Sequence, residues 1–362
     1  MSMLKSATIA PFAFAVAALL AACSSGASQS APASGLGIDS FLHVPGTLAR
    51  PDRPGRLFLG VKWTGHIHRD HRKSWISPDA QRFRRILFGT DVGTGDVYML
   101  AMPQMSLVGT ITGFVFPQGE CSDRQGNIWI ADTDADQVLE YSRTGTLLNT
   151  IVDSYGFPQS CAINPINNAI AVADGDSLDG SPGQVLIYSS PSSSPTVLTN
   201  PTQTFYEFLG YDPSGDLWVD GFGPEYGIPI VSSCGASSCS TINLSGGTIG
   251  FPGAIQWDNV RNTWVIFDQF CMADYTSCSY PLSGSGVLGT PTMYSNFNGG
   301  PACDIVQGVI AAFGRRYATG ADYDYCGYSR SSFSRWPYPA GGTPTHHTID
   351  VAIPVGAAIS TK

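Results

Sequence analysis

A short apolar run that ends in aspartate occurs six times in this chain of 362 residues. The six runs are RRILFGTD (84–91), GNIWIAD (126–132), NNAIAVAD (167–174), GDLWVD (215–220), RNTWVIFD (261–268) and RRYATGAD (315–322). Their final aspartates are 41, 42, 46, 48 and 54 residues apart. A repeat of this length is typical of a β-propeller, in which each repeat forms one blade and contacts only its neighbours.

The residues inside one repeat predict four short strands. In the second repeat these strands are expected at residues 117–123, 128–132, 137–142 and 147–153. The third repeat has the same order of segments, and the innermost strands of the later repeats are expected at 208–212, 252–258 and 301–307. Short strands joined by tight turns form an antiparallel sheet, which is the blade of a propeller.

The first repeat lacks an inner strand ahead of its apolar run, and the far C-terminus supplies one at residues 354–360. Pairing of this segment with the first blade closes the ring and removes an exposed sheet edge. The content of 41 Gly and 25 Pro also suits an all-β chain better than a helical one. The sequence therefore predicts an all-β, six-bladed β-propeller of four-stranded blades, closed by the C-terminal strand.

The repeats resemble those of NHL-type propellers, in which P-x-G-x-A-x-D precedes G-N-I-Y-V-A-D and an apolar strand ending in an aromatic residue. The resemblance is close in PQGECSD and GNIWIAD of the second repeat and in the third, fair in the fourth and degenerate in the fifth and sixth. It covers roughly Trp75 to Ser360. The order of segments is also similar to that of uncharacterised secreted propeller lipoproteins of soil bacteria. This resemblance implies a fold and no activity.

The N-terminus indicates export. Lys5 precedes an apolar stretch, Ala7 to Ala22, which is short for a membrane span and reads as a secretory signal. The sequence Leu20-Ala21-Ala22-Cys23 resembles the bacterial lipoprotein signal, which implies acylation of Cys23 and anchoring in the cell envelope, at the outer membrane or cell surface. A plain signal peptide with a chance cysteine is the alternative. We expect a signal peptide at 1–22, a flexible tether at 23–49, a basic segment at 50–74 and the propeller at 75–362.

Eight cysteines remain if Cys23 carries lipid, and an even number suits pairing in an oxidising compartment. Two local disulfides are candidates, Cys234 with Cys239 and Cys271 with Cys278, and Cys326 competes for either pair. The inner-strand cysteines are expected to be buried free thiols: Cys121, Cys161 and Cys303. A thiolate metal site is disfavoured because neither C-x-x-C nor nearby histidine supports it.

Charge is unevenly divided along the chain. Residues 50–85 carry a net charge of +7, and residues 86–362 carry −16. An acidic propeller is a poor nucleic-acid binder, so no nucleic-acid partner is expected. The basic segment either approaches anionic lipid head groups or packs against the propeller. We favour packing, because Phe58, Leu59, Val61 and Trp63 give this segment apolar side chains to bury.

The loops that follow the six aspartates belong to one face of a propeller, and they combine carboxylates with aromatic residues. Such a mouth suits a divalent cation, a sugar or a cationic group. The alternative is a solvated rim of an acidic protein. The residues predicted to bind a ligand there are Asp132, Asp134, Asp136, Asp174, Asp220, Asp268, Asp322, Tyr226 and Tyr323.

Calcium is the one cofactor that the sequence suggests. Residues 132–137, DTDADQ, begin like a calcium loop, with oxygen ligands two residues apart. The loop lacks the glycine of an EF-hand and has Arg143 where the closing glutamate would stand, which excludes an EF-hand. In residues 174–180, DGDSLDG, we expect Asp and Gly to form a turn.

Two further acids, Glu120 and Asp304, are predicted on inner strands, where they can serve as metal ligands or a general base. This arrangement resembles the gluconolactonase-like six-bladed hydrolases, which use acidic residues around a central Ca²⁺, although the matching Asn and Asp partners are not found here. All six histidines lie outside the blades or at their closure, which argues against a His-dependent centre.

The sequence thus predicts an exported, lipid-anchored, monomeric binding or scaffolding module, more a binder than an enzyme. Its expected partners are the membrane, through the lipid, and an unidentified glycan, small molecule or protein. The competing predictions are a Ca²⁺-dependent hydrolase of small esters or lactones that uses Glu120 and Asp304, and an envelope protein with a purely structural role.

Overall fold

The computed structural model describes residues 73–177, 181–224, 228–271, 276–313, 315–323, 330–349 and 351–362. The chain divides into two compact units, residues 1–34 and 35–362, and the first lies wholly outside the described residues. The predictions for the signal peptide, Cys23, the tether, nearly all of the basic segment and Tyr226 also fall outside them. No helix in the described ranges is long and apolar enough to cross a membrane.

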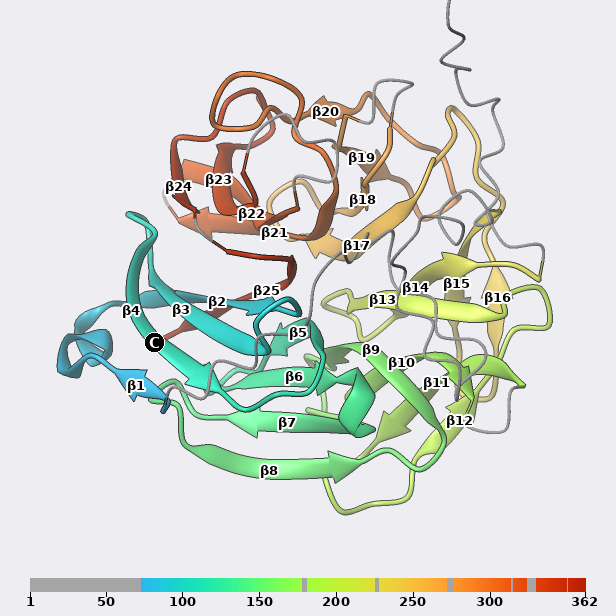
Figure 1. The fold of residues 1–362 in the computed structure, drawn as a ribbon. Helices are drawn as coiled ribbons and strands as arrows, with labels where there is room; N and C mark the ends of the chain where they lie inside the picture. Colours follow the sequence, from blue (N-terminus) through green and yellow to red (C-terminus); the bar gives the residue numbers. More distant parts are fainter. Residues whose placement is uncertain are drawn as a thin grey trace, which may run out of the picture. The chain divides into compact units, whose positions relative to one another are not determined.

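Six antiparallel sheets form the second unit, and they are arranged as a ring (Figure 1). The innermost strands are β25 (Pro354–Thr361), β5 (Pro117–Ser122), β9 (Gly156–Ile163), β13 (Phe205–Tyr211), β17 (Pro252–Asp258) and β21 (Ile305–Phe313). The second strands are β2 (Arg85–Asp91), β6 (Ile128–Asp132), β10 (Ile170–Ser177), β14 (Leu217–Phe222), β18 (Thr263–Asp268) and β22 (Arg315–Asp322). The all-β, six-bladed propeller is confirmed.

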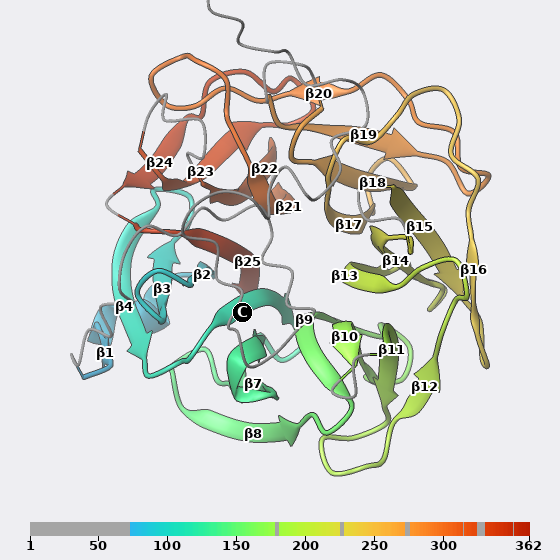
Figure 2. The same cartoon turned by 45° about the vertical axis from the view of Figure 1, so that its right-hand side comes forward.

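The outer strands complete the blades, and Figure 2 shows them along the rim of the ring. The third strands are β3 (Asp96–Ala101), β7 (Gln137–Tyr141), β11 (Pro182–Tyr188), β15 (Pro229–Cys234), β19 (Cys278–Leu282) and β23 (Ser332–Pro337). The fourth strands are β4 (Ser106–Thr112), β8 (Leu147–Val152), β12 (Thr196–Leu198), β16 (Cys239–Thr241), β20 (Thr292–Met293) and β24 (His346–Ile349). We number the blades 1 to 6 in the order of their second strands.

Closure of the ring follows the prediction. Strand β25 pairs with β2 in an antiparallel ladder in which Leu87 faces Ile359, so the C-terminus supplies the inner strand of blade 1. A short strand, β1 (Trp75–Ile76), adds a fifth member at the outer edge of this blade. Two 3-10 turns, η1 (Pro78–Arg82) and η2 (Thr133–Ala135), are the helical elements of the described residues.

The apolar runs of the repeat form the contacts between blades. All five residues of β6, Ile128 to Asp132, are buried, because both faces of a middle strand are covered by neighbouring blades. Separate apolar clusters join blades 1 and 2, 2 and 3, 3 and 4, 4 and 5, and 6 and 1. A sixth cluster joins blades 5 and 6 and extends to residues of blades 1, 2 and 4. Each blade is therefore stabilised by its neighbours, as in other repeat folds.

Glycine in the P-x-G pattern allows the inner strands to converge at the centre. A Cβ atom at Gly119 would lie 2.4 Å from the Cβ of Ser160 on the next inner strand, and one at Gly356 would lie 2.2 Å from the carbonyl oxygen of Gln118. A side chain at either position would separate adjacent inner strands. The physical basis of the motif is thus close backbone approach.

Two strand predictions need correction. The inner strand of blade 6 was expected at 301–307, and β21 instead spans Ile305–Phe313, because the apolar segment continues past Gly308. Asp304 therefore precedes the strand, in a left-handed conformation with φ 68°. The turn expected from Asp174 onward is also wrong at its start, because β10 continues in pairing as far as Ser177.

The inner-strand cysteines are not free thiols, contrary to expectation. Cys121 of β5 and Cys161 of β9 form a disulfide with a Cα–Cα distance of 5.5 Å, and Cys303 is also disulfide-bonded. Convergence of the inner strands brings thiols of neighbouring blades within bonding distance. The two local candidates form as well, Cys234 with Cys239 and Cys271 with Cys278.

Candidate functional site

The repeated aspartates are buried at or near the ends of the second strands, and each has at most 2% of its surface exposed. In blades 2 and 5 their carboxylates accept backbone hydrogen bonds from the loop that leads into the inner strand. Asp132 accepts from the N–H groups of Val115 and Phe116, the shortest bond being 2.7 Å. These bonds fasten the end of the second strand to the start of the first, which is a structural role.

Asp268 and Asp91 repeat this arrangement. Asp268 accepts bonds of 2.9–3.1 Å from the backbone N–H groups of Gly250, Phe251 and Phe270. Asp91 accepts from those of Gly93, Ala352 and Ile353, so it helps to close the ring. Burial raises the pKa of Asp268 to about 6, and its backbone hydrogen bonds oppose this rise.

Blades 3 and 4 are built differently, because their second strands continue beyond the aspartate. Asp220 accepts one backbone bond, from Phe208 N–H at 2.8 Å, and its Oδ2 is buried with no partner among the described residues. Asp174 is similar, since its Oδ1 has no partner among the described residues, and its side chain shares hydrogen bonds with Asp153 and Gln184. Burial raises the pKa of both Asp174 and Asp220 well above the usual range.

Glu207 of β13, Asp220 of β14 and Asp304 before β21 form a buried acidic cluster. All three side chains are completely buried. Burial raises the pKa of Glu207 well above its usual range, and repulsion from Asp220 and Asp304 raises it further. Gln269 approaches this cluster, with its Nε2 3.5 Å from Glu207 Oε1. We call these four residues the acidic centre.

The atoms of the acidic centre that lack a hydrogen-bond partner within the described ranges are all acceptors. They are Glu207 Oε2, Asp220 Oδ2, both carboxylate oxygens of Asp304 and Gln269 Oε1. Buried polar atoms of folded proteins are nearly always paired. Carboxylates in such surroundings either hold protons or face a compensating cation. The described part of the chain provides no cationic side chain in hydrogen bond or ion pair with these oxygens.

Glutamines connect the inner strands around the centre of the ring. Gln307 accepts hydrogen bonds from the backbone N–H groups of Glu120 and Ala357 and donates to Glu120 O at 2.8 Å, so it joins blades 6, 1 and 2. Gln118 donates to the side chain of Gln159 at 2.9 Å. These bonds hold the inner strands in fixed positions relative to one another.

Glu120 is a second isolated acid of the inner strands. It is 2% exposed, and neither carboxylate oxygen has a hydrogen-bond partner among the described residues. Burial raises its pKa well above the usual range, and the backbone of Thr90 opposes this rise. In blade 6, Gly308 holds the position in the ladder that corresponds to Glu120, so Asp304 is not its structural equivalent.

The aspartates of the DTDADQ segment do not form a preassembled calcium loop. Asp132 is directed to the backbone of residues 115 and 116, Asp134 lies in the turn η2, and Asp136 ends this turn in a left-handed conformation. Within the described ranges, Asp268, Cys271 and Cys278 are the one group of three His, Cys, Asp or Glu residues with ligand atoms within 4.8 Å of each other. The disulfide between Cys271 and Cys278 occupies both sulfurs of that group.

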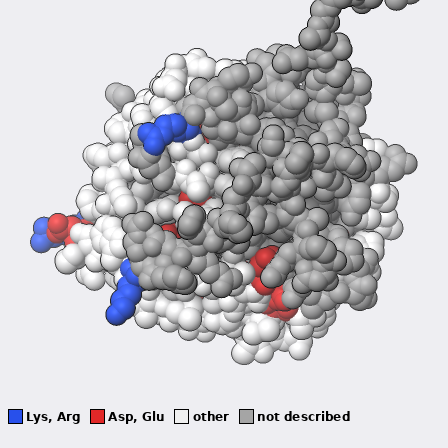
Figure 3. Space-filling model, in the orientation of Figure 1, with Lys and Arg blue, Asp and Glu red and all other residues white. Residues whose placement is uncertain are grey.

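The remaining predicted site residues are aromatic or lie in blade 6. Tyr323 follows Asp322 and packs, half-buried, against the apolar cluster that includes Phe251 and Phe270. Asp322 is 2% exposed at the end of β22. The ligand role of these residues stays a prediction. On the face shown in Figure 3 the visible acidic side chains form small separate spots, and most described atoms there belong to uncharged residues.

The sequence analysis missed Glu207 and Gln269. Glu207 interrupts the aromatic run FYEFLGY, and an acid within a buried strand is a signal that was available. Gln269 directly follows a repeated aspartate, and nothing in the repeat pattern distinguishes it. Neither residue recurs from repeat to repeat, so the repeat pattern does not mark them.

Comparison with known proteins gives the fold and no activity. No sequence family matches this chain, and no curated protein matches it. Its structure is similar to that of a protein of unknown function from Bacteroides caccae, with a TM-score of 0.57 and 13% identity over 77% of this chain and 100% of that one. A calcium-binding protein, regucalcin, from Agrobacterium tumefaciens strain C58 gives a TM-score of 0.49 and 13% identity over 68% of this chain and 79% of that one. At this identity a shared fold does not assign a function.

Proposed function

We propose that this protein is an exported, lipid-anchored binding module and that the acidic centre binds a cation. The observation that carries the proposal is the set of fully buried, mutually repelling carboxylates of Glu207, Asp220 and Asp304, whose unsatisfied atoms are all acceptors. A bound cation would compensate these charges. A protonated, empty centre is the alternative state of the same residues.

A hard divalent ion such as Ca²⁺ suits the donor set. Glu207 and Asp304 would supply carboxylate oxygens, and Gln269 Oε1 would supply an amide oxygen, all of which are ligand types that Ca²⁺ accepts. No three carboxylates of the acidic centre have oxygens within 4.8 Å of one another. An ion bound there would therefore keep water among its ligands. The predicted mouth residues, Asp134 and Tyr323 among them, would then line the approach.

Export and anchoring are supported by two separate features of the chain. Three disulfides and a further bonded cysteine, Cys303, suit an oxidising compartment. The Leu20-Ala21-Ala22-Cys23 sequence resembles a lipoprotein signal. Acylation of Cys23 would then tether the propeller to the envelope through a flexible segment.

The test is the melting temperature of the oxidised protein with Ca²⁺ and after chelation with EDTA. Binding to the folded state at about a hundredfold excess over Kd adds about 2.7 kcal/mol, or several degrees in the midpoint. We expect this rise in the wild type and its loss in Glu207→Gln and Asp304→Asn. Glu140→Gln is the matched control, because Glu140 is buried outside the acidic centre and bonds Asn127.

The control should keep the calcium-dependent rise even if its own midpoint falls. Equal midpoints with Ca²⁺ and EDTA in the wild type would reject the calcium site. A rise that persists unchanged in Glu207→Gln and Asp304→Asn would move the site away from the acidic centre.

A hydrolase of small esters or lactones is the second candidate, and one observation favours it. Glu120 is a buried acid whose two oxygens have no hydrogen-bond partner among the described residues and whose pKa is raised, which is the state of a carboxyl group held ready for proton transfer. Hydrolysis of a lactone panel that depends on Ca²⁺ and falls at least about a hundredfold in Glu120→Gln would support it. Equal turnover by the wild type and by Glu120→Gln would exclude a hydrolase that uses Glu120.

A further inference from the structure

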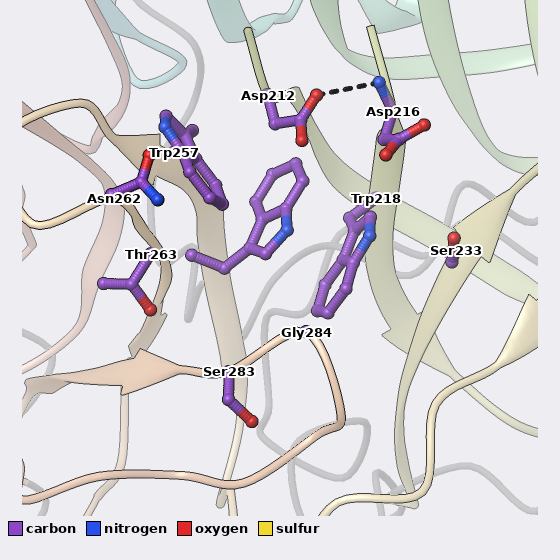
Figure 4. Close-up of a pocket in the computed structure, with 10 residues that line it drawn as sticks. Asp212, Asp216, Trp218, Ser233, Trp257, Asn262, Thr263, Ser283 and Gly284 are labelled. Carbon is purple, nitrogen blue, oxygen red and sulfur yellow. Dashed lines mark hydrogen bonds between the residues drawn. The ribbon is translucent and has the colours of Figure 1, made fainter. Parts of the chain in front are cut away.

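A pocket of about 500 Å³ lies between blades 4 and 5, away from the acidic centre. This volume is within the range of small-ligand sites. Figure 4 shows its lining, with tryptophan rings between polar side chains of three turns. We call it the tryptophan pocket, and the lining residues used below are Asp212, Asp216, Trp218, Trp257, Asn262 and Trp264.

The pocket opens on the opposite end of the blades from the repeated aspartates. Asp212 and Asp216 belong to the turn between β13 and β14, and Asn262 to the turn between β17 and β18. Asp220 and Asp268 lie toward the far ends of β14 and β18. A ligand here would therefore be independent of the proposed cation.

Three tryptophans from neighbouring blades form the apolar part, and Trp257 presents the accessible ring, because Trp218 and Trp264 are only 5% and 3% exposed. Trp218 and Trp264 stack with ring centroids 4.8 Å apart and an interplanar angle of 15°. Trp257 meets Trp264 edge to face, at 5.5 Å and 83°. Gly210 permits this arrangement, because a Cβ there would lie 2.5 Å from the carbonyl oxygen of Ile255 on the next inner strand. The stack is thus held rigidly by two blades.

Polar groups surround these rings. Asp212 Oδ1 accepts the backbone N–H groups of Ser214 and Asp216 at 2.8 and 2.9 Å, which fixes the turn and leaves the Asp216 side chain exposed. The indole Nε1 of Trp257 is buried and has no acceptor among the described residues. Asn262, which is exposed, adds an amide with both donor and acceptor atoms.

We propose that the tryptophan pocket binds a neutral pyranose unit of a glycan. A pyranose has an apolar C–H face that suits indole rings and an edge of hydroxyl groups that suits carboxylates and amides. Hydroxyl groups can donate to Asp212 and Asp216 and can accept from the amide of Asn262. The two carboxylates disfavour acidic sugars and phosphates by like-charge repulsion.

Titration calorimetry of the purified full-length chain tests this proposal, in a detergent without a sugar head group. The probes are cellohexaose, N-acetylchitohexaose, mannohexaose and xylohexaose as neutral ligands and hexagalacturonic acid as the anionic one. We expect at least one neutral hexasaccharide to bind and hexagalacturonic acid to bind at least about tenfold more weakly than it.

Two variants locate the binding. Trp257→Ala should weaken the neutral ligand at least about tenfold, and Asp216→Asn, at an exposed position that does not endanger folding, by about threefold or more. Trp257→Phe keeps a smaller aromatic ring, so its affinity should fall between those of wild type and Trp257→Ala. Trp75→Ala, at a tryptophan 47% exposed in blade 1, and Asp79→Asn, in an exposed turn, are matched controls that should bind as the wild type does.

Binding by no neutral probe up to about 10 mM would overturn the proposal. So would equal binding of hexagalacturonic acid, or a neutral ligand whose affinity is the same in wild type, Trp257→Ala and Asp216→Asn. Because Asp216→Asn retains the fold, its result decides the matter if Trp257→Ala proves unstable.

Discussion

The same sequence motif produces two different environments in this propeller. In blades 2 and 5 the repeated aspartate accepts hydrogen bonds from two backbone N–H groups of the loop before the inner strand. In blades 3 and 4 the equivalent residues, Asp174 and Asp220, each keep one oxygen without a partner in the described part of the chain, and their pKa values are strongly raised. Asp132 and Asp268 therefore stabilise their blades, whereas Asp174 and Asp220 are buried carboxyl groups with incomplete hydrogen bonding.

The residue after the aspartate explains the difference. Thr133 and Gln269 follow it in blades 2 and 5, where the second strand ends at the aspartate. Gly175 and Gly221 follow it in blades 3 and 4, where the strand continues to Ser177 and Phe222. A Cβ at Gly221 would lie 2.0 Å from the carbonyl oxygen of Phe205, so only glycine permits this continued pairing.

Continued pairing takes away the partners of the carboxylate. The backbone of the lead-in segment then pairs with the extended second strand, as in Phe205 with Phe222 and Gly156 with Ser177. Its amide groups are no longer directed at the aspartate. The repeated aspartate has backbone partners for its carboxylate in blades 1, 2 and 5, whereas in the adjacent blades 3 and 4 one oxygen has none among the described residues. Such a local exception to the repeat is where function is expected.

The largest expected effect tests the structural half of this comparison. Asp268→Ala removes the acceptor of three backbone N–H groups and should lower the free energy of unfolding by about 3–6 kcal/mol. Asp220→Ala removes the acceptor of one and also relieves repulsion with Glu207, so it should cost less than half as much. Urea unfolding at pH 7 in EDTA measures both. Equal costs would show that the two environments do not differ.

The next largest effect is a pH dependence of stability that comes from Asp176, a residue buried in the extended second strand of blade 3. Burial raises the pKa of Asp176 to about 7. Because the folded pKa lies above the unfolded value of about 3.9, the folded state binds the proton more tightly. Its stabilising contribution is complete below about pH 4 and is lost as the pH rises to about 7.

Asp176→Asn should therefore be more stable than the wild type at pH 8, by about 2–4 kcal/mol, and should match it near pH 4. Urea midpoints at several pH values measure this difference. A variant whose stability relative to the wild type is constant from pH 4 to pH 8 would show that Asp176 titrates normally.

Much of the fold followed from the sequence because a repeat imposes its geometry many times. The six occurrences of the aspartate motif predicted the number of blades. The missing inner strand of the first repeat predicted closure by residues 354–360. The inner strand of blade 6 was misplaced because Pro301 imitates the proline that begins the inner strands of blades 2 and 5, while the apolar pattern itself starts at Ile305.

The acidic centre was harder to predict, since it depends on which strands end early. The sequence pattern places Asp304 within the inner strand of blade 6, but β21 begins one residue later, at Ile305. Glu207 was not selected, although its flanking aromatic residues mark it as buried. The acidic centre combines residues of β13 and β14 with a residue of the segment before β21, which lies about 100 positions further along the chain. No local pattern in a single sequence reports contacts over such a separation.

The smallest expected effect examines the acidic half of the comparison directly. Glu207→Gln replaces a buried acid by an amide of the same shape, whose N–H groups can donate to the unsatisfied oxygens of Asp220 and Asp304. Without a cation at pH 8, we expect the variant to be more stable than the wild type by about 1–2 kcal/mol. Near pH 5 the advantage should largely vanish, because the wild-type acid then holds its proton at little cost.

Glu140→Gln should change the stability of the folded protein in the opposite direction. Glu140 accepts hydrogen bonds from Asn127 and Asn149, so an amide there loses at least one acceptor and should destabilise the protein at both pH values. Urea unfolding in EDTA compares the two variants. If Glu207→Gln destabilised the protein as Glu140→Gln does, the carboxylate of Glu207 would have a partner in the empty protein, and the acidic centre would be satisfied like the aspartates of blades 2 and 5.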